Sequence, residues 1–262
     1  MYLRVLGLVE LRIDGRTLVA RRPQQAAVLA ALAVDANRPL RTEALIARIW
    51  GEQPPERARR TLHTHISGLR RLLEQGGGER TTAQLLRRPG CYLLEVDADC
   101  VDLHRFQRLT DTAADRTGDE RVMLLRAAMR LWRGDALAGV PGDWAQRVRE
   151  AYRQHYLGTV VNWAQAEVVA GNADTVIGPL TLLAGEYPLT ESLAGALMRA
   201  LHAAGRGADA LDQYARTRRR LVDELGVEPG PDLRAVNAAI LRGEPLPARP
   251  GAPDAPILSS VP

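Results

Sequence analysis

Hydrogen-bond donors recur along residues 56–73 at spacings that place them together on one side of a helix. They are Arg59, Arg60, His63, Thr64, Ser67, Arg70 and Arg71. No carboxylate interrupts this set. A helix fits the major groove of B-DNA, where arginine pairs with guanine and Ser, Thr or His side chains reach base edges or phosphates. The residue types and their spacing therefore predict a surface that binds DNA.

The opposite side of the same stretch is apolar. Its large aliphatic residues follow one another at spacings of four, three and four, which is the period of an amphipathic helix. They are Leu62, Ile66, Leu69 and Leu73. We therefore expect a helix over residues 56–74 with this stripe in the core. A solvated basic face is the alternative, and Thr61 is an equal choice between a base contact and a packing residue.

The distribution of charge supports the DNA interpretation. The chain has a net charge of +4, which is too small to argue from alone. Residues 1–98 hold 16 Arg and 10 acidic residues, a net of +6, whereas residues 99–262 have a net of −2. Such asymmetry is typical of a nucleic-acid-binding module with an attached partner domain.

The residues before the basic helix predict strands and then two helices. Residues 2–20 have the pattern of strands around Asp14-Gly15, a dipeptide typical of hairpin turns. Pro23 suits the first turn of a helix. Thr42 is the expected N-cap of the next helix, which should end at Gly51.

A hairpin is expected after the basic helix. Residues 85–96 are typical of two strands around the turn Arg88-Pro89-Gly90. Strands, three helices and a hairpin, in that order, predict a winged helix. Arg87 and Arg88 lie near the hairpin tip, where a wing meets phosphates or the minor groove.

The second part of the chain has a helical pattern from about Asp102 to Arg242. A self-similarity at a spacing of 34 relates the glycines at 171 and 205 and the alanines at 166 and 200. A 34-residue helix–turn–helix unit is the tetratricopeptide signature. We expect a tetratricopeptide-like domain over residues 99–243 and a disordered, proline-rich tail over residues 244–262.

Several motifs indicate a known family. Residues 1–98, with Arg-Thr-Leu-His-Thr-His-Ile at 60–66, resemble the OmpR-type winged-helix DNA-binding domain. Leu-Trp-Arg-Gly-Asp-Ala-Leu at 131–137 and Leu-Val-Asp-Glu-Leu-Gly-Val-Glu-Pro-Gly-Pro-Asp-Leu at 221–233 resemble the start and end of a bacterial transcriptional activation domain. This pairing resembles the Streptomyces antibiotic regulatory protein (SARP) family. Cys91 departs from the family wing, where a second glycine is usual.

The resemblance implies a mainly α fold with a small β component: a winged helix with an N-terminal sheet and a C-terminal hairpin, followed by all-α helical repeats. It implies a transcriptional activator of a secondary-metabolite (antibiotic) gene cluster that binds direct repeats in promoter DNA as a homodimer. It also implies recruitment of RNA polymerase holoenzyme through the loop that contains Glu52, Pro54 and Glu56. The alternative is a protein–protein adaptor with a vestigial winged helix.

The sequence carries no paired catalytic carboxylates, nucleophile–base motif or phosphate loop, so we expect no enzyme activity and no cofactor. His63 and His65 lie on different sides of a helix and cannot bind one metal ion, so no metal site is expected. Cys91 and Cys100 are expected to be free thiols, with a disulfide as the alternative. Because no segment has the length of a membrane helix, we expect a bacterial cytoplasmic, nucleoid-associated protein with no membrane contact.

Overall fold

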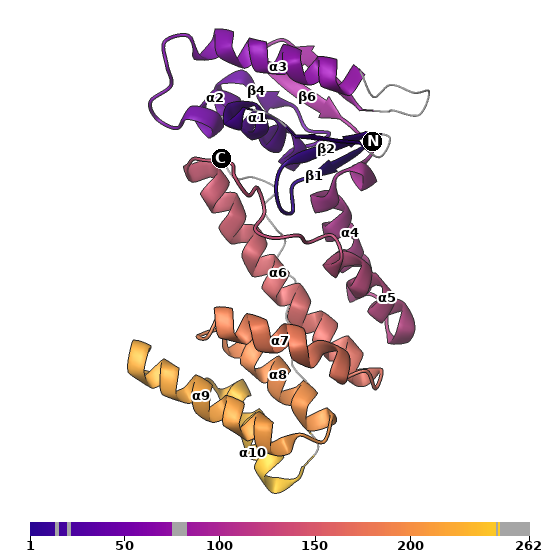
Figure 1. Ribbon diagram of the computed structural model, residues 1–262, viewed down its shortest axis with the longest axis vertical. Coiled ribbons are helices and arrows are strands. Elements are labelled where there is room, and N and C mark those ends of the chain that lie inside the picture. Colours follow the sequence, from indigo (N-terminus) through magenta and orange to yellow (C-terminus); the bar gives the residue numbers. More distant parts are fainter. Residues whose placement is uncertain (14–15, 20–21, 75–82, 245, 247–262) are drawn as a thin grey trace. The chain divides into compact units, whose positions relative to one another are not determined.

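A computed structural model describes residues 1–13, 16–19, 22–74, 83–244 and 246 (Figure 1). The chain divides into two compact units. The N-terminal unit comprises Met1–Thr112 and Ala127–His155, and the helical unit comprises Ala113–Arg126 and the residues from Tyr156 onward. The expected turn at Asp14-Gly15 lies outside the described residues, as does the expected tail apart from Glu244 and Leu246.

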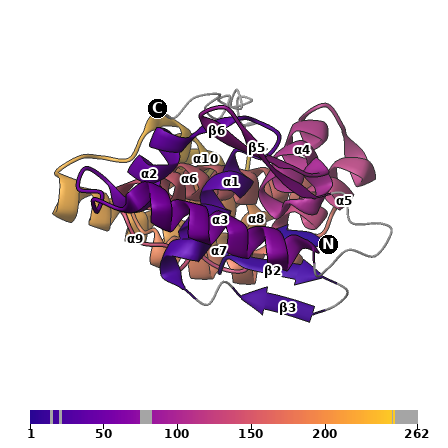
Figure 2. The same ribbon diagram turned by 90° about the horizontal axis from the view of Figure 1, so that it is seen from above.

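A three-stranded antiparallel sheet opens the N-terminal unit. It consists of β1 (Tyr2–Arg4), β2 (Glu10–Ile13) and β3 (Arg16–Val19), in that order. Strands β2 and β3 lie side by side (Figure 2). Leu3 pairs with Leu11, and both side chains are buried. The expected leading sheet is confirmed.

Three helices follow, as the sequence predicts. They are α1 (Pro23–Val34), α2 (Thr42–Trp50) and α3 (Ala58–Glu74). Helix α1 begins at Pro23, whose fixed φ suits the first turn. The four aliphatic residues of the α3 stripe are each at most 5% exposed, which confirms the orientation of this helix. These four side chains belong to the same hydrophobic core as buried residues of α1 and α2.

The hairpin of the winged helix forms a second sheet. Strand β6 (Cys91–Glu95) lies between β4 (Leu40–Arg41) and β5 (Gln84–Arg88), and both pairings are antiparallel. The N-cap prediction for Thr42 is wrong, because Thr42 is the first helical residue and Arg41 precedes it as the cap. The Thr42 hydroxyl instead donates to the carbonyl of Gly90 at 3.1 Å.

Beyond the hairpin, a 3-10 turn (Ala98–Cys100) leads to α4 (Asp102–Ala114), α5 (Gly118–Met129) and α6 (Asp143–Val169). The helical pattern does not hold between α5 and α6, where residues 130–142 are irregular. Their backbone instead bonds to the segment between β1 and β2. The Leu137 amide donates to Val5 O at 2.8 Å and the Ala138 amide to Gly7 O at 2.9 Å.

A buried carboxylate completes this connection within the N-terminal unit. Asp102 is fully buried and accepts the amides of Val5 at 2.8 Å and Leu6 at 3.1 Å. Arg133, from the Leu-Trp-Arg-Gly-Asp motif, donates to the same carboxylate at 3.0 Å. These contacts explain why the motif interrupts the helices. Its backbone amides donate to carbonyls of the segment between β1 and β2, and not to carbonyls of a helix.

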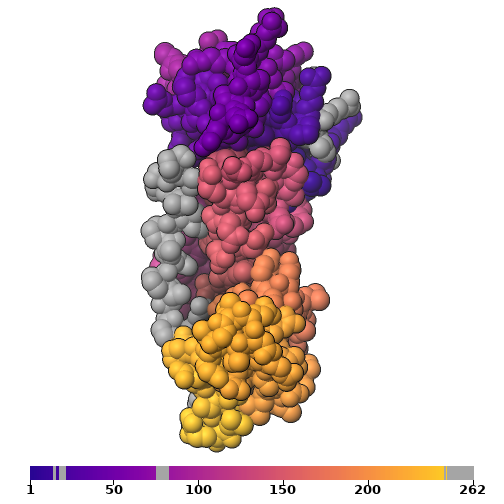
Figure 3. Space-filling view, turned by 90° about the vertical axis from the view of Figure 1, so that its left-hand side faces the viewer, coloured from indigo at the N-terminus to yellow at the C-terminus, as the bar shows by residue number. Residues whose placement is uncertain are grey.

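The helical unit contains α7 (Asp174–Glu186), α8 (Glu191–Ala203), α9 (Gly207–Leu225) and α10 (Pro231–Arg242). Their atoms are coloured orange to yellow in Figure 3. The expected repeat is visible in the turns after α6 and α8. Gly171 N donates to Val168 O and Gly205 N to His202 O, and the next amide in each turn reaches back to the carbonyl of Glu167 or Leu201. Each donor and each acceptor in the second turn lies 34 residues after its counterpart in the first turn.

These two turns need glycine. Gly171 and Gly205 have φ angles of +79° and +75°, in the left-handed region that other residues rarely adopt. The same 34-residue spacing in the sequence therefore reflects two helix ends of the same kind.

A second buried carboxylate stabilises the helical unit. Glu167 is fully buried and accepts two bonds from Arg126, at 2.5 and 2.6 Å, one from Trp163 at 2.7 Å and one from Asn172 at 3.1 Å. Burial alone would raise the pKa of Glu167, but these donors together lower it below the ordinary value. The ion pair joins α5 to α6.

Candidate nucleic-acid interface

Helix α3 presents a polar face opposite its buried stripe. Its exposed members are Arg59, Arg60, Thr64, Ser67 and Arg71. Thr64 donates to the Arg60 carbonyl at 3.1 Å, one turn back in the helix. Three further candidates from the sequence, Thr61, His63 and Arg70, are half-buried. The helix therefore offers a continuous set of donors, of which only part is fully accessible.

Arg59 is paired with a carboxylate. Its guanidinium lies 2.7 Å from Glu43 of α2, and both side chains are more than half exposed. A backbone hydrogen bond at Glu43 itself, followed by the charge of Arg59, lowers the pKa of Glu43. Because exposed ion pairs are weak, a phosphate could displace Glu43 from Arg59 at little cost.

Arg70 connects the helix to the wing. Its Nε donates to the carbonyl of Leu85 on β5 at 2.8 Å. Arg70 therefore holds the end of α3 against the hairpin, a role that its position in the sequence does not reveal.

The two histidines have different surroundings, as their spacing predicts. His65 is buried beside Gln24, and burial, with a smaller effect of Arg22, lowers its pKa. His63 was expected to face outward with the arginines, but it is half-buried, and its Nδ1 lies 3.0 Å from the hydroxyl of Tyr92 on β6. The two rings meet edge to face, with centroids 6.1 Å apart.

The two wing arginines lie on opposite faces of the hairpin. Arg87 pairs across the strands with Tyr92, and Arg88 pairs with Cys91. Since residues directly opposite in an antiparallel pair point to the same side, Arg87 shares the face of Tyr92, and Arg88 shares that of Cys91. Both arginines are exposed.

One basic residue near the wing, Arg41, does not stand out in the sequence. Arg41 on β4 pairs with Cys91, so Arg41 and Arg88 flank this cysteine on one face of the sheet. Arg41 is exposed. Strand β4 has only two residues, which is too short for a recognisable strand pattern in the sequence. The only signal in the sequence was the basic residue itself, immediately before Thr42.

The tip of the wing is anchored to α2. The Gly90 carbonyl accepts both the amide of Thr42, at 2.9 Å, and its hydroxyl. Gly90 has a φ of +72°, whereas Cys91 begins β6 in regular pairing. The cysteine in place of the usual second glycine therefore leaves the wing intact.

The loop between α2 and α3 projects polar side chains. Glu52, Pro54 and Glu56 are exposed. Within the described residues, neither carboxylate has an ion-pair partner. Gly51, with a φ of +67°, ends α2 and lets the chain turn into this loop. The loop is accessible for contact with a protein partner.

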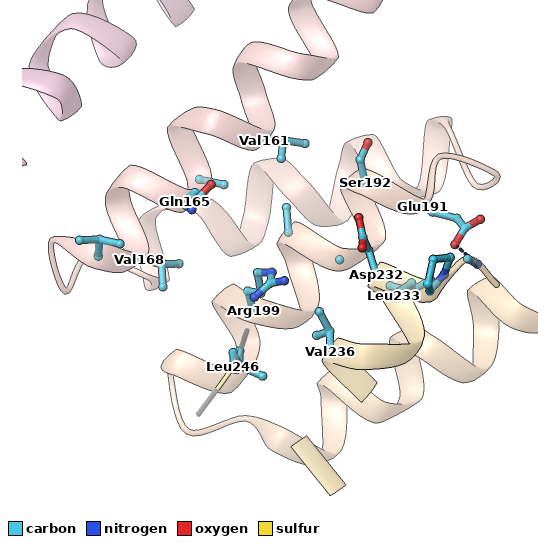
Figure 4. Close-up of a pocket in the computed structure, with 16 residues that line it drawn as sticks. Val161, Gln165, Val168, Glu191, Ser192, Arg199, Asp232, Leu233, Val236 and Leu246 are labelled. Atoms are coloured by element: carbon cyan, nitrogen blue, oxygen red, sulfur yellow. Dashed lines mark hydrogen bonds between the residues drawn. The ribbon is translucent and has the colours of Figure 1, made fainter. Parts of the chain in front are cut away.

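The helical unit contains a mainly apolar groove of about 510 Å³ (Figure 4). It lies among α6, α8 and α10, which are alternate helices of the stack, and Val161, Val168 and Val236 contribute to its wall. Glu191, at the rim, accepts the amide of Gly230 at 2.7 Å. Alternate helices of a tetratricopeptide-like stack line its concave side, which is the side that such repeats use for binding.

Other kinds of site find little support in the described part of the chain. There, no three His, Cys, Asp or Glu side chains gather as metal ligands, and both cysteines are free thiols. Among the helices of the described ranges, none combines the length and the apolar character needed to cross a bilayer.

Two family models match the chain. The Bacterial transcriptional activator domain matches residues 101–241, and the Transcriptional regulatory protein, C terminal, matches residues 15–93. The second match contains α3 and most of the wing, and the first begins beside Asp102.

Curated relatives match along almost the whole chain. Transcriptional regulatory protein EmbR of Mycobacterium tuberculosis is 36% identical over 95% of this chain and 65% of its own length. Transcriptional regulatory protein MoaR1 of the same species is 36% identical over 92% of this chain and 79% of its own. Regulatory protein AfsR of Streptomyces coelicolor is 39% identical over 92% of this chain but only 24% of its own length.

A solved structure has the same architecture. It is that of Mycobacterium tuberculosis EmbR in complex with a low-affinity phosphopeptide, with a TM-score of 0.85 and 35% identity. The match covers 94% of this chain and 66% of that one. The expected fold, mainly α with small antiparallel sheets, is confirmed.

Proposed function

This chain belongs to the Streptomyces antibiotic regulatory protein family and is a transcriptional regulator, and from that premise we propose that it is a sequence-specific activator. It binds direct repeats upstream of promoters and recruits RNA polymerase. Its targets are the genes of a secondary-metabolite (antibiotic) cluster, and it acts at the nucleoid in the bacterial cytoplasm.

The proposal rests on the polar face of α3, whose donors oppose a fully buried stripe. Five residues are assigned to base edges in the major groove: Arg60, His63, Thr64, Ser67 and Arg71. Arg59 and Arg70 are assigned to phosphates. The wing residues Arg87 and Arg88 are assigned to phosphates or to the minor groove. Thr61, which is half-buried on α3, is the remaining candidate for a DNA contact.

We assign the exposed loop with Glu52, Pro54 and Glu56 to RNA polymerase rather than to DNA. Carboxylates are repelled by phosphates, and their charges here are unpaired within the described residues. Pro54 and its neighbouring proline restrict the backbone, which lowers the entropy lost when the loop binds a protein.

The helical unit is assigned to assembly as a homodimer on DNA. Two winged helices on direct repeats face the same way, and a head-to-tail contact alone does not close after two copies. A second contact, made through the helical repeats, limits the assembly to two copies. The groove among α6, α8 and α10 is the candidate surface for this contact. We assign residues 1–98 to DNA binding and residues 99–243 to activation.

Capture of genomic fragments by the purified protein, followed by sequencing, tests the function. The expected result is enrichment of direct repeats upstream of promoters, with affinity that falls steeply as salt rises because phosphate contacts release counterions. The variant R60A/R71A should lose this enrichment. R147A/R219A, which removes two exposed arginines outside α3 and the wing, should keep it.

The alternative function is a protein–protein adaptor, which the apolar groove of the helical unit favours. In that case the captured fragments would have no common sequence, and R60A/R71A would behave like R147A/R219A. Either outcome would overturn the activator proposal.

A further inference from the structure

The ring of His63 lies between the candidate recognition helix and the wing. Its Nδ1 is 3.0 Å from the Tyr92 hydroxyl, and Tyr92 is only 2% exposed. The opposite ring nitrogen, Nε2, has no hydrogen-bond partner among the described residues, and it is not one of the buried side-chain atoms there that lack a partner. His63 therefore has one nitrogen fixed inside the domain and one open to the surface.

The Tyr92 hydroxyl restricts the proton positions on this ring. A neutral imidazole carries one proton, either on Nδ1 or on Nε2. If Nδ1 carried it, Nδ1 would donate to the tyrosine oxygen, and the buried phenolic O–H would have no acceptor among the described residues. If Nε2 carries it, Nδ1 accepts from Tyr92 and both groups are satisfied.

Protonation does not change the character of the outer nitrogen. In the imidazolium both nitrogens are donors, so Nε2 still carries a proton. In both the favoured neutral form and the charged form, the accessible nitrogen of His63, Nε2, is therefore a hydrogen-bond donor.

We propose that Tyr92 is a positioning residue that holds His63 with Nε2–H outward, so that His63 meets DNA only as a donor. In the major groove a donor selects guanine N7 or O6, adenine N7 or thymine O4, and is rejected by the amino groups of cytosine and adenine. The inference rests on the proposed function, because it specifies what one residue of that surface recognises.

The neighbouring wing residue strengthens the assignment. Arg87 lies directly opposite Tyr92 and shares its face of the sheet. An arginine is also a donor without an acceptor. His63 of α3 and Arg87 of the wing, which both lie beside Tyr92, therefore both carry hydrogen-bond donors.

The tautomer is measured without DNA, which separates this inference from the proposed function. In the full protein labelled with ¹⁵N-histidine, long-range ¹H–¹⁵N spectra report which nitrogen carries the proton. The signals of His63 are identified by their loss in H63Q. In the neutral ring we expect the proton on Nε2, and in Y92F we expect a shift toward a mixture of the two tautomers. An Nδ1–H form in the unaltered protein would overturn the inference.

The two amide substitutions then test the donor. Glutamine places its amide nitrogen near the position of Nε2, whereas asparagine places its polar group near that of Nδ1. On a duplex obtained by selection from a random pool, H63Q should bind more tightly than H63N, roughly two- to tenfold, the range of one hydrogen bond. Equal affinities of H63Q and H63N would overturn the donor role.

A double-mutant cycle completes the test. Y92F should weaken binding to the same duplex, but it should add no loss to H63Q, which no longer depends on the tyrosine. Additive losses would show that Tyr92 acts on DNA binding by another route. If the tautomer is Nε2–H and no His63 variant changes affinity, the placement of His63 at the DNA fails while the tautomer assignment stands.

Discussion

Asp102 accepts a hydrogen bond from Arg133 at 3.0 Å, and the same carboxylate accepts the amides of Val5 and Leu6. Three segments that lie far apart in the sequence therefore meet at one fully buried side chain. Burial raises the pKa of Asp102, while the two amides and Arg133 oppose that rise. The N-terminal sheet thus depends on residues well beyond the winged helix.

Replacement of Asp102 by asparagine should destabilise the N-terminal unit by roughly 1–3 kcal/mol. An asparagine has one acceptor oxygen, so its NH₂ group would face a buried amide or Arg133. Urea unfolding followed by circular dichroism measures the change. D111N removes the same charge from an exposed position on α4 and should be nearly neutral. Equal stability of both variants would contradict the role given to Asp102.

Glu167 should make the stability of the helical unit sensitive to acid. Its pKa is lower in the folded protein than its ordinary value of 4.5, so its stabilising effect is present above that value and is lost as the pH falls through the folded pKa. E167Q should lose roughly 1.5–3 kcal/mol at neutral pH, and its difference from the unaltered protein should shrink in acid.

Thermal unfolding between pH 7 and pH 3 measures this difference. E186Q, at an exposed position on α7, serves as the control and should behave like the unaltered protein at every pH. A stability gap between E167Q and the unaltered protein that stays constant over this range would show that Glu167 stabilises the fold without titrating.

Arg41 and Arg88 should act on phosphates, since they flank Cys91 on one face of the wing sheet. R41A and R88A should each weaken binding to specific and unrelated duplexes alike and lower the salt slope by about 1. R60A should cost roughly 1–3 kcal/mol on the specific duplex only. Fluorescence anisotropy at several salt concentrations distinguishes these results, and a sequence-selective loss in R41A would contradict its assignment.

The loop between α2 and α3 should matter for transcription but not for DNA affinity. E52A/E56A removes two exposed carboxylates without touching the core. We expect transcription in vitro to fall severalfold with purified polymerase, while anisotropy shows unchanged affinity for the promoter. A parallel loss of transcription and affinity would assign the loop to DNA binding instead.

Cooperative binding to two direct repeats should depend on their spacing. Repeats about one helical turn apart, ~10–10.5 bp, place both recognition helices on one side of the duplex. Insertion of about half a turn, ~5 bp, should abolish cooperativity, and a full added turn should partly restore it. Footprinting measures this, and a footprint of one isolated half-site, or an inverted repeat insensitive to spacing, would contradict the assembly.

The elements whose signals are local could be predicted from the sequence. The stripe from Leu62 to Leu73 gave the orientation of α3, and Pro23 marked the start of α1. The paired glycines at 171 and 205 predicted the repeat, because each helix end needs the left-handed conformation.

Contacts between distant residues could not be predicted. Nothing near Thr42 indicates that its hydroxyl bonds to Gly90, and nothing near His63 indicates Tyr92. Likewise, residues 130–142 have enough apolar side chains to resemble a helix in the sequence. In the structure, amides of this segment donate hydrogen bonds to the carbonyls of Val5 and Gly7. In each case the partner lies at least 29 residues away, beyond the range of periodicity.

The identical turns after α6 and α8 have a consequence for how such genes change length. Each turn closes on its own preceding helix, through bonds that span only a few residues. A tandem copy of the coding sequence from one turn to the next would therefore insert a complete helix pair, with both of its ends already capped. Larger relatives could arise by in-frame duplication at these points, whereas a break inside a helix would separate a cap from the carbonyls that it satisfies.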